Sequence, residues 1–317
     1  MDARTAGIRD ASLLSAAVVL GALMAPQLAF VGLPVAAAGV AGLAYRGRIA
    51  VAGVAAVLGV AAVFALQRID AVFVAPAVVA VLFAVALLPK RSAQVVGAVL
   101  IGVLALASAG FEELLARAQG TTLTAMTALQ LQLAVGELTK ALGASASAEL
   151  VSRLKEVALT MSTAWPATYF ESAVFVGVLV IVAIAWAARR AGREVNVPSL
   201  SRLDLTPHVL WAFVVGLLLL AASYGNYPTS KALGVVGLNL VLCVRTLFAL
   251  QGLSVSAGVL DRTGVGLGGR ILALAALAAL DALTLVVSFI GLLDFWVNFR
   301  RLPRDGVTPA APTQAGA

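Results

Sequence analysis

The sequence has few charged residues and very little histidine, cysteine or aromatic side chain. Charged residues make up 12% of the 317 positions. Soluble domains carry about a quarter, so this chain has too little polar surface to face water on all sides. A single cysteine, Cys243, excludes a disulfide within the chain, and a single histidine, His208, leaves too few ligands for a zinc or haem site. We therefore expect no metal and no cofactor.

Long apolar runs dominate what is present. Hydrophobic residues make up 62% of the chain, the mean hydropathy is +1.03, and glycine occurs 29 times. Small residues let membrane helices approach each other closely. Since one span needs about 20 apolar residues, the predicted fold class is all-α, a polytopic transmembrane helical bundle of about eight or nine spans. The apolar runs are 11–24, 30–45, 49–66, 71–88, 93–110, 166–188, 209–224, 233–260 and 271–297.

Most basic residues lie at those ends of the apolar runs that would face one side of a membrane. With a cytoplasmic N-terminus, fifteen of the 22 lysines and arginines fall in cytoplasmic connections and six on the outer side, as the positive-inside rule requires. This distribution predicts a lipid bilayer as the environment, a cytoplasmic N-terminus and no nucleic-acid partner. The last apolar run fits one tilted helix or a broken segment. We favour a segment that bends near Asp281 and returns to the cytoplasm.

Residues 111–165 differ from the rest of the chain because charged residues return there. Apolar side chains recur on one helical face, at Leu150, Leu154, Val157 and Met161. This pattern predicts one or two amphipathic helices at the membrane surface. They could form a cap packed on the bundle or a lid over a binding site, and the sequence leaves both open.

Ionisable side chains inside the apolar runs are the candidate functional residues, because a charge in the bilayer is costly and is usually paired or functional. Arg245 needs a partner from another helix, and Asp281 is the candidate by depth. Such a pair could fix the register of two helices or form part of a substrate or ion site, and both interpretations stay open. The candidate substrate-binding residues are Glu171, Asn239, Arg245, Gln251 and Asp281.

A second group of polar residues lies at the end of the last apolar run, near the expected inner interface. Asp294 and Asn298 are four residues apart on one helical face, and Trp296 between them suits the level of the lipid headgroups. The group could anchor the chain at the interface or dock a cytoplasmic partner. The candidate interface residues are Asp294, Trp296, Asn298, Arg300 and Arg301.

Four short segments occur in an order and spacing typical of a known family. They are 45–47 (YRG), 204–211 (DLTPHVLW), 250–253 (LQGL) and 291–301 (GLLDFWVNFRR). Together they resemble the YybS-like family of bacterial membrane proteins, the DUF2232 domain. The resemblance implies a protein of the bacterial inner membrane. It also implies that the first six helices are similar to the S components of energy-coupling factor transporters, in a superfamily that includes the cell-shape protein MreD.

The resemblance and the composition together suggest three parts. An S-component-like helical core at 1–190 contains the amphipathic insert 111–165, and C-terminal transmembrane helices follow at 191–303. The tail, 304–317, is rich in proline, alanine and glycine, and this composition predicts disorder.

These expectations favour one function and leave two others open. The first is a small-solute-binding, transporter-like module. The alternative is a non-transporting, MreD-like scaffold that recruits membrane or cytoplasmic protein partners. A lipid-modifying enzyme is third. We expect no enzyme, because the sequence has no HExxH motif, no Cys/His group and no paired carboxylates at helical spacing.

Overall fold

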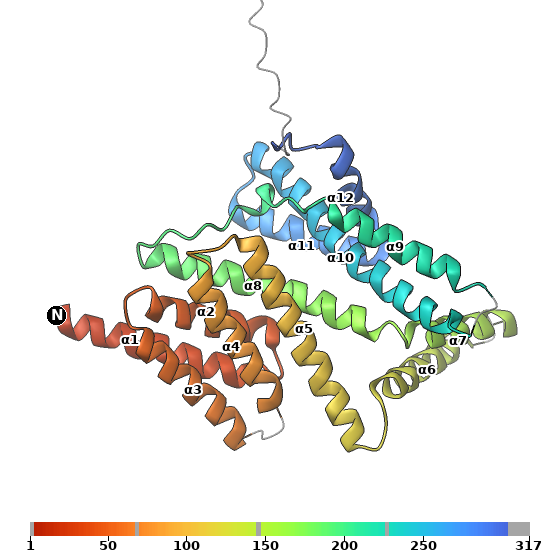
Figure 1. Ribbon diagram of the computed structural model, residues 1–317, viewed down its shortest axis with the longest axis horizontal. Coiled ribbons are helices and arrows are strands. Elements are labelled where there is room, and N and C mark those ends of the chain that lie inside the picture. The colour runs from red at the N-terminus through yellow and green to blue at the C-terminus, as the bar shows by residue number, and fades with distance from the viewer. Residues whose placement is uncertain (1–2, 67–69, 144–146, 226–227, 304–317) are drawn as a thin grey trace, which may run out of the picture.

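The computed structural model describes residues 3–66, 70–143, 147–225 and 228–303, which form helices and no strand (Figure 1). The all-helical fold class is therefore confirmed. The tail predicted to be disordered, 304–317, lies outside the described residues. In chain order the helices are α1 (Ala3–Met24), α2 (Ala29–Ala44), α3 (Ile49–Leu66), α4 (Ala71–Leu87), α5 (Ala93–Ala118), α6 (Leu123–Leu142), α7 (Ala148–Met161), α8 (Trp165–Arg190), the short η2 (Leu200–Arg202), α9 (His208–Ala222), α10 (Ser230–Arg262), α11 (Leu267–Thr284) and α12 (Val286–Val297).

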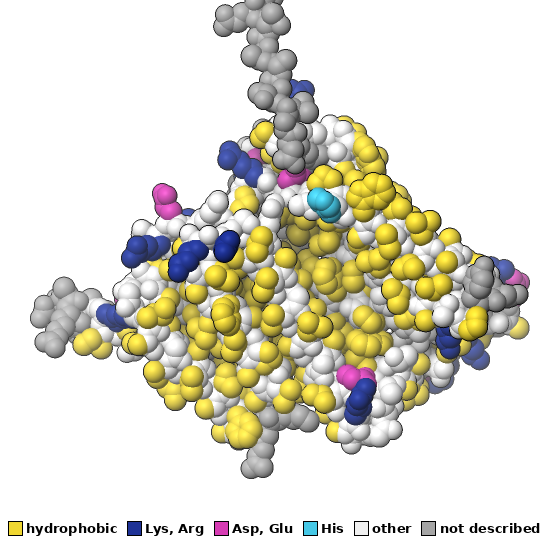
Figure 2. Space-filling view, viewed as in Figure 1, with side chains coloured by type: hydrophobic (Ala, Val, Ile, Leu, Met, Phe, Trp, Pro, Cys, Tyr) yellow, Lys and Arg dark blue, Asp and Glu magenta, His cyan; other side chains and the backbone are white. Residues whose placement is uncertain are grey.

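Six of the described helices are long and apolar enough to cross a membrane, and four more are apolar but shorter. The long ones are α1, α3, α5, α8, α10 and α11, and the short ones are α2, α4, α9 and α12. Apolar side chains cover most of the face seen in Figure 2, and many large ones are exposed. Such a surface suits lipid better than water. The nine apolar runs thus correspond to ten described helices, because the last run is divided between α11 and α12.

Helices α1 to α5 and α8 share an apolar core made mostly of alanine and valine. Its largest fully buried side chains include Leu33, Leu43 and Leu100. α1 packs on α2 and α3, and α8 packs on α2 and α5. A Cβ at Gly21 or Gly32 would overlap backbone atoms of the facing segment, so these two glycines permit the close contact of α1 with α2.

Helices α9 to α12 form the C-terminal part, which is organised around α10. This helix has 33 residues and is about 50 Å long at the α-helical rise. Both α9 and α12 pack on it. Leu285, in a left-handed conformation with φ 60°, separates α11 from α12. The predicted bend of the last apolar run is confirmed, and it lies four residues beyond Asp281.

Hydrogen bonds between distant segments bring both described ends of the chain to the same end of the bundle. Each bond runs from a side chain to a backbone carbonyl in a segment far away in the sequence. The bonded pairs are Arg48–Gly7, Tyr45–Val85, Arg193–Tyr45, Gln94–Asp204 and Arg300–Leu203. The broken α11–α12 segment therefore returns the chain to the end of the bundle at which α1 begins.

Helices α6 and α7 occupy the insert, at the opposite end of the bundle. α5 continues to Ala118, beyond the end at Gly110 that the apolar run predicted. An ion pair between Glu113 and Arg117, four residues apart and 2.7 Å long, stabilises this extra length. α6 and α7 pack on each other, and nearly all their side chains are at least partly exposed.

Candidate functional site

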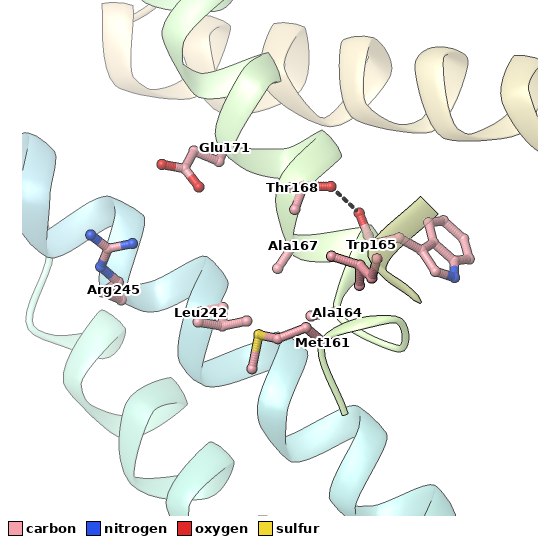
Figure 3. Close-up of a pocket in the computed structure, with 9 residues that line it drawn as sticks. Met161, Ala164, Trp165, Ala167, Thr168, Glu171, Leu242 and Arg245 are labelled. Carbon is pink, nitrogen blue, oxygen red and sulfur yellow. Dashed lines mark hydrogen bonds between the residues drawn. The ribbon is translucent and has the colours of Figure 1, made fainter. Parts of the chain in front are cut away.

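A cavity of about 270 Å³ lies between α8 and α10, where α6 and the end of α7 meet them. Figure 3 shows Glu171 on α8 and Arg245 on α10 facing the gap between these helices. The Thr168 hydroxyl also lines the cavity and donates to the Trp165 carbonyl at 2.8 Å. The remaining wall is apolar and consists of Leu131, Met161, Ala164, Trp165, Ala167 and Leu242.

The two charged residues of the cavity differ in their partners. Arg245 Nη2 lies 2.9 Å from Asp281 Oδ2 and 3.0 Å from the Asp281 carbonyl oxygen. The predicted Arg245–Asp281 pair is thus confirmed. The Arg245 Nε–H group is buried and has no acceptor in the described part of the chain. Glu171 is exposed and, among the described residues, has neither a hydrogen bond nor an ion pair.

Asp281 has a second role, because it caps the start of α12. The Ser288 backbone N–H donates to Asp281 Oδ1 at 2.7 Å, and the Ser288 hydroxyl donates to Oδ2 at 2.8 Å. The residue at the N-cap of α12, Leu285, has no side chain that can accept these bonds. A free N–H inside a bilayer costs several kcal/mol, and a carboxylate at a helix start also interacts favourably with the helix dipole. Asp281 therefore stabilises the break and binds Arg245 at the same time.

Asn239 performs the same task for α8. The N-cap residue of α8, Ala164, has no capping side chain, and Asn239 Oδ1 on α10 accepts from the Ala167 backbone N–H at 3.0 Å. Asn239 Nδ2 donates to the carbonyls of Thr163 and Val235 at 2.8 and 2.9 Å. All these bonds are internal to the protein, so Asn239 fixes the start of α8, which carries the wall of the cavity.

Gln251 belongs to a different site, which we call the buried polar cluster. Its members are Asp204, Gln251, Ser254, Asp294 and Arg300. Gln251 Nε2 donates to Asp204 Oδ1 at 2.8 Å and to Asp294 Oδ2 at 2.9 Å. Arg300 forms ion pairs with Asp294 at 2.8 Å and with Asp204 at 3.3 Å, and it donates to Ser254 Oγ. The cluster joins α10, α12 and the segment before α9.

The burial of this cluster corrects one expectation. Asp294 is fully buried and the Arg300 side chain is only 4% exposed, so neither lies on an exposed docking surface, which was one of the two interpretations that the sequence left open. The physical reason is that the carboxylate of Asp294 and the guanidinium of Arg300 neutralise each other's charge, so both can be buried away from water. Trp296 and Arg301 are exposed, as expected of interface residues, and Asn298 ends α12 with its Nδ2 donating to the Leu302 carbonyl at 2.8 Å.

Two glycines allow the helices to approach closely enough for the cluster to form. A Cβ at Gly252 on α10 would overlap the carbonyl oxygen of Val287 on α12. A Cβ at Gly291 on α12 would overlap the carbonyl oxygen of Phe248. This backbone contact lets the side chain of Gln251, next to Gly252, reach Asp294 within hydrogen-bond distance.

The structure therefore separates the candidate substrate-binding residues. Glu171 and Arg245 line one cavity, Asn239 and Asp281 hold its walls, and Gln251 lies in the buried polar cluster. Among the described residues, no group of three or more His, Cys, Asp or Glu side chains could hold a metal ion.

Sequence reasoning missed several members of these sites. Asp204 begins the family segment 204–211 and precedes a Thr-Pro helix start, but nothing in the sequence indicates that its carboxylate is bonded to Gln251 and Arg300. Ser254 and Ser288 lie in apolar helices and give no local signal, because a serine there can also bond within its own helix. The apolar lining of the cavity, such as Leu131 and Leu242, is indistinguishable in sequence from lipid-facing residues.

The long apolar helices and the internally satisfied polar groups define a polytopic α-helical membrane protein. The chain belongs to the family described as predicted membrane protein (DUF2232), whose model matches residues 13–295. This confirms the family resemblance. Three of the segments that carried it, 204–211, 250–253 and 291–301, meet in the buried polar cluster. No curated protein and no solved structure matches the chain.

Proposed function

We propose that this protein is a small-solute-binding, transporter-like membrane module whose ligand occupies the cavity between α8 and α10. The observation that carries the proposal is a cavity of about 270 Å³ with an apolar wall and two charged side chains from different helices. Small-molecule sites are typically apolar with a few polar groups that orient the ligand, and they measure about 300–1,000 Å³. The size therefore favours a small solute.

The break between α11 and α12 supports a transporter-like role. Transporters often bind substrates beside discontinuous helices near the middle of the membrane. Arg245, which lines the cavity, is bonded to Asp281, which in turn caps α12 at the break. A ligand that contacts Arg245 would thus be linked, through Asp281, to the break between α11 and α12.

The binding proposal is tested by analysing what copurifies with the full chain. A small molecule should be released from purified wild-type protein and be depleted about tenfold or more from Leu242→Trp, which fills the cavity. Leu217→Trp is the matched control, because Leu217 is exposed on α9 and does not line the cavity. Equal ligand content in the two variants, both shown to be folded by thermal unfolding, would refute the proposal. Ala167→Phe provides a second cavity-filling variant.

A non-transporting scaffold is the second candidate, and helices α6 and α7 favour it. Leu129 and Leu133 on α6 are 58% and 63% exposed, one helical turn apart. Such a face suits either lipid headgroups or a partner protein. A scaffold should yield a stoichiometric partner in a native pull-down, and Leu129→Glu/Leu133→Glu should release it. Recovery of the chain alone counts against this candidate.

For location, we propose the bacterial inner membrane with a cytoplasmic N-terminus, and binding rather than catalysis as the activity. The support for sidedness is the excess of arginine and lysine at the end of the bundle that includes Arg48 and Arg193. In a Cys243→Ser background, Glu137→Cys on α6 should react with an impermeant thiol reagent in intact cells, and Arg48→Cys should not. The reverse pattern would contradict the orientation.

A further inference from the structure

The charged residues at the cavity do not balance one another. Arg245 already has a counter-ion, since the Asp281 carboxylate lies 2.9 Å from its guanidinium group. Asp281 is also held by both the backbone N–H and the hydroxyl of Ser288. Glu171 has no cationic partner within 4 Å in the described part of the chain. The three side chains Glu171, Arg245 and Asp281 therefore carry one negative charge in excess.

The apolar surroundings of Glu171 indicate that the excess negative charge has a functional role. Glu171 lies within α8, a helix long and apolar enough to span the membrane, and its neighbours in the cavity wall are mostly apolar. A carboxylate without a counter-ion is costly in such surroundings and usually marks a substrate or ion pathway. Glu171 also lies on the wall of the cavity rather than at a distant surface (Figure 3).

Building on the binding function proposed above, we infer the charge class of the ligand. We propose that the cavity takes a small organic monocation, a protonated amine with an apolar body. The ammonium group donates hydrogen bonds to the Glu171 carboxylate, which removes the excess negative charge. The apolar body packs against Leu131, Met161 and Leu242. Arg245 stays with Asp281 and forms the opposite wall.

Other charge classes fit the same wall less well. An anion would have to compete with Asp281 for Arg245 while lying in the same cavity as the unpaired Glu171 carboxylate. A zwitterion would satisfy Glu171 but would bring a second carboxylate to an arginine that already has one. A neutral molecule would leave Glu171 without a counter-ion. The monocation alone neutralises the site and leaves the Arg245–Asp281 pair intact.

The inference is tested with four probes that share one apolar body and differ in charge. Phenethylamine is the cation, phenylpropionate the anion, phenylalanine the zwitterion and phenylethanol the neutral compound. Each is added to the purified full chain in lipid nanodiscs, and the midpoint of thermal unfolding, Tm, is measured. A ligand that binds only the folded state raises Tm. Phenethylamine should raise it by at least ~2 °C at saturation, and more than the other three probes.

Two variants test the role of Glu171. Glu171→Gln should weaken phenethylamine binding about tenfold or more in a titration. Glu156→Gln is the matched control, because Glu156 is an exposed carboxylate on α7 that does not line the cavity, and it should bind as the wild type does. Equal phenethylamine affinity in wild type and Glu171→Gln would overturn the assignment of Glu171.

Failure of this inference is distinguishable from failure of the binding function. Stronger stabilisation by phenylpropionate, phenylalanine or phenylethanol would overturn the monocation class but would leave the cavity as a solute site. An anionic or neutral molecule that copurifies with the wild-type chain and is lost from Leu242→Trp would also overturn the monocation class and leave the cavity as a solute site. If the wild-type chain and Leu242→Trp release the same molecules, the binding function itself fails.

Discussion

The N-terminal helices and the C-terminal helices of this protein are held together by different interactions. The core shared by α1 to α5 and α8 is apolar and consists mostly of alanine and valine. In the C-terminal part, six polar or charged side chains are buried in α10, α11, α12 and the segment after α12: Gln251, Ser254, Asp281, Ser288, Asp294 and Arg300. The only other buried polar side chain among the described residues is Ser162.

The difference follows from helix continuity. Continuous helices satisfy their own backbone groups, so they can pack through small side chains alone. α12 has only 12 residues and begins directly after the break at Leu285. Its first N–H groups need acceptors, although α12 itself packs closely on α10. Buried polar groups supply the cap, and they add hydrogen bonds and ion pairs to this packing.

The largest expected effect comes from a substitution in the buried polar cluster of the C-terminal part. Among the described residues, Asp294→Ala leaves the buried Arg300 guanidinium with only the more distant Asp204 as counter-ion, at 3.3 Å. Removing one partner of a buried ion pair costs about 3–5 kcal/mol. The free energy of unfolding, measured by denaturant titration in bicelles, should fall by that amount. Glu137→Ala, which removes an exposed pair with Lys140, should change nothing measurable. Equal stability of the two variants would contradict the importance of the cluster.

The next effect concerns the break itself. Asp281→Ala removes the cap of α12 and leaves Arg245 without its counter-ion, so it should cost about 2–4 kcal/mol. Arg245→Ala should cost less, because Asp281 keeps its two bonds from Ser288. A double-mutant cycle should give a coupling of about 0.5–3 kcal/mol, with the double variant more stable than the sum of the single effects predicts. Strict additivity would show that the pair contributes nothing.

Close helix packing at glycine occurs in both the N-terminal and the C-terminal helices, so its contribution to stability can be tested separately from that of the buried polar groups. Gly291→Ala forces a methyl group onto the Phe248 carbonyl oxygen and should destabilise by about 1–3 kcal/mol. Gly53→Ala is the control, since no described atom outside its own helical turn lies within 4 Å of the added Cβ. It should be neutral or stabilising by up to ~1 kcal/mol through helix propensity. Thermal unfolding of both variants tests this, and a neutral Gly291→Ala would disprove the close contact.

The smallest expected effect lies in the apolar core. Leu33 is 1% exposed, and in a soluble protein its replacement by alanine would cost about 2–5 kcal/mol. In lipid the unfolded reference state is itself apolar, so only packing is lost and we expect about 1–2 kcal/mol. Leu106→Ala, at a residue 76% exposed, is the control and should have little effect. A loss for Leu33→Ala above that of Asp294→Ala would reverse the comparison.

Some features of the candidate site were predictable because they depend on local rules. The pairing of Arg245 with Asp281 follows from the cost of a lone charge in an apolar run and from similar depth. The bend near Asp281 follows from a run too long for one untilted span and too short for two. In contrast, Asp294 and Arg300 look like interface residues in sequence because Trp296, between them, suits the level of the lipid headgroups. Only the structure shows that both are buried.

The sequence by itself determined the environment, the helical class, the family and the location of the charges in the apolar runs. These depend on composition and on residues close together along the chain. Only the tertiary structure decided which polar groups satisfy one another and where the cavity lies. Gln251 and Asp294 are 43 residues apart, and their bond depends on the backbone contact at Gly252 and Gly291. Glu171 and Arg245 meet at one cavity because Asn239 fixes the start of α8 on α10.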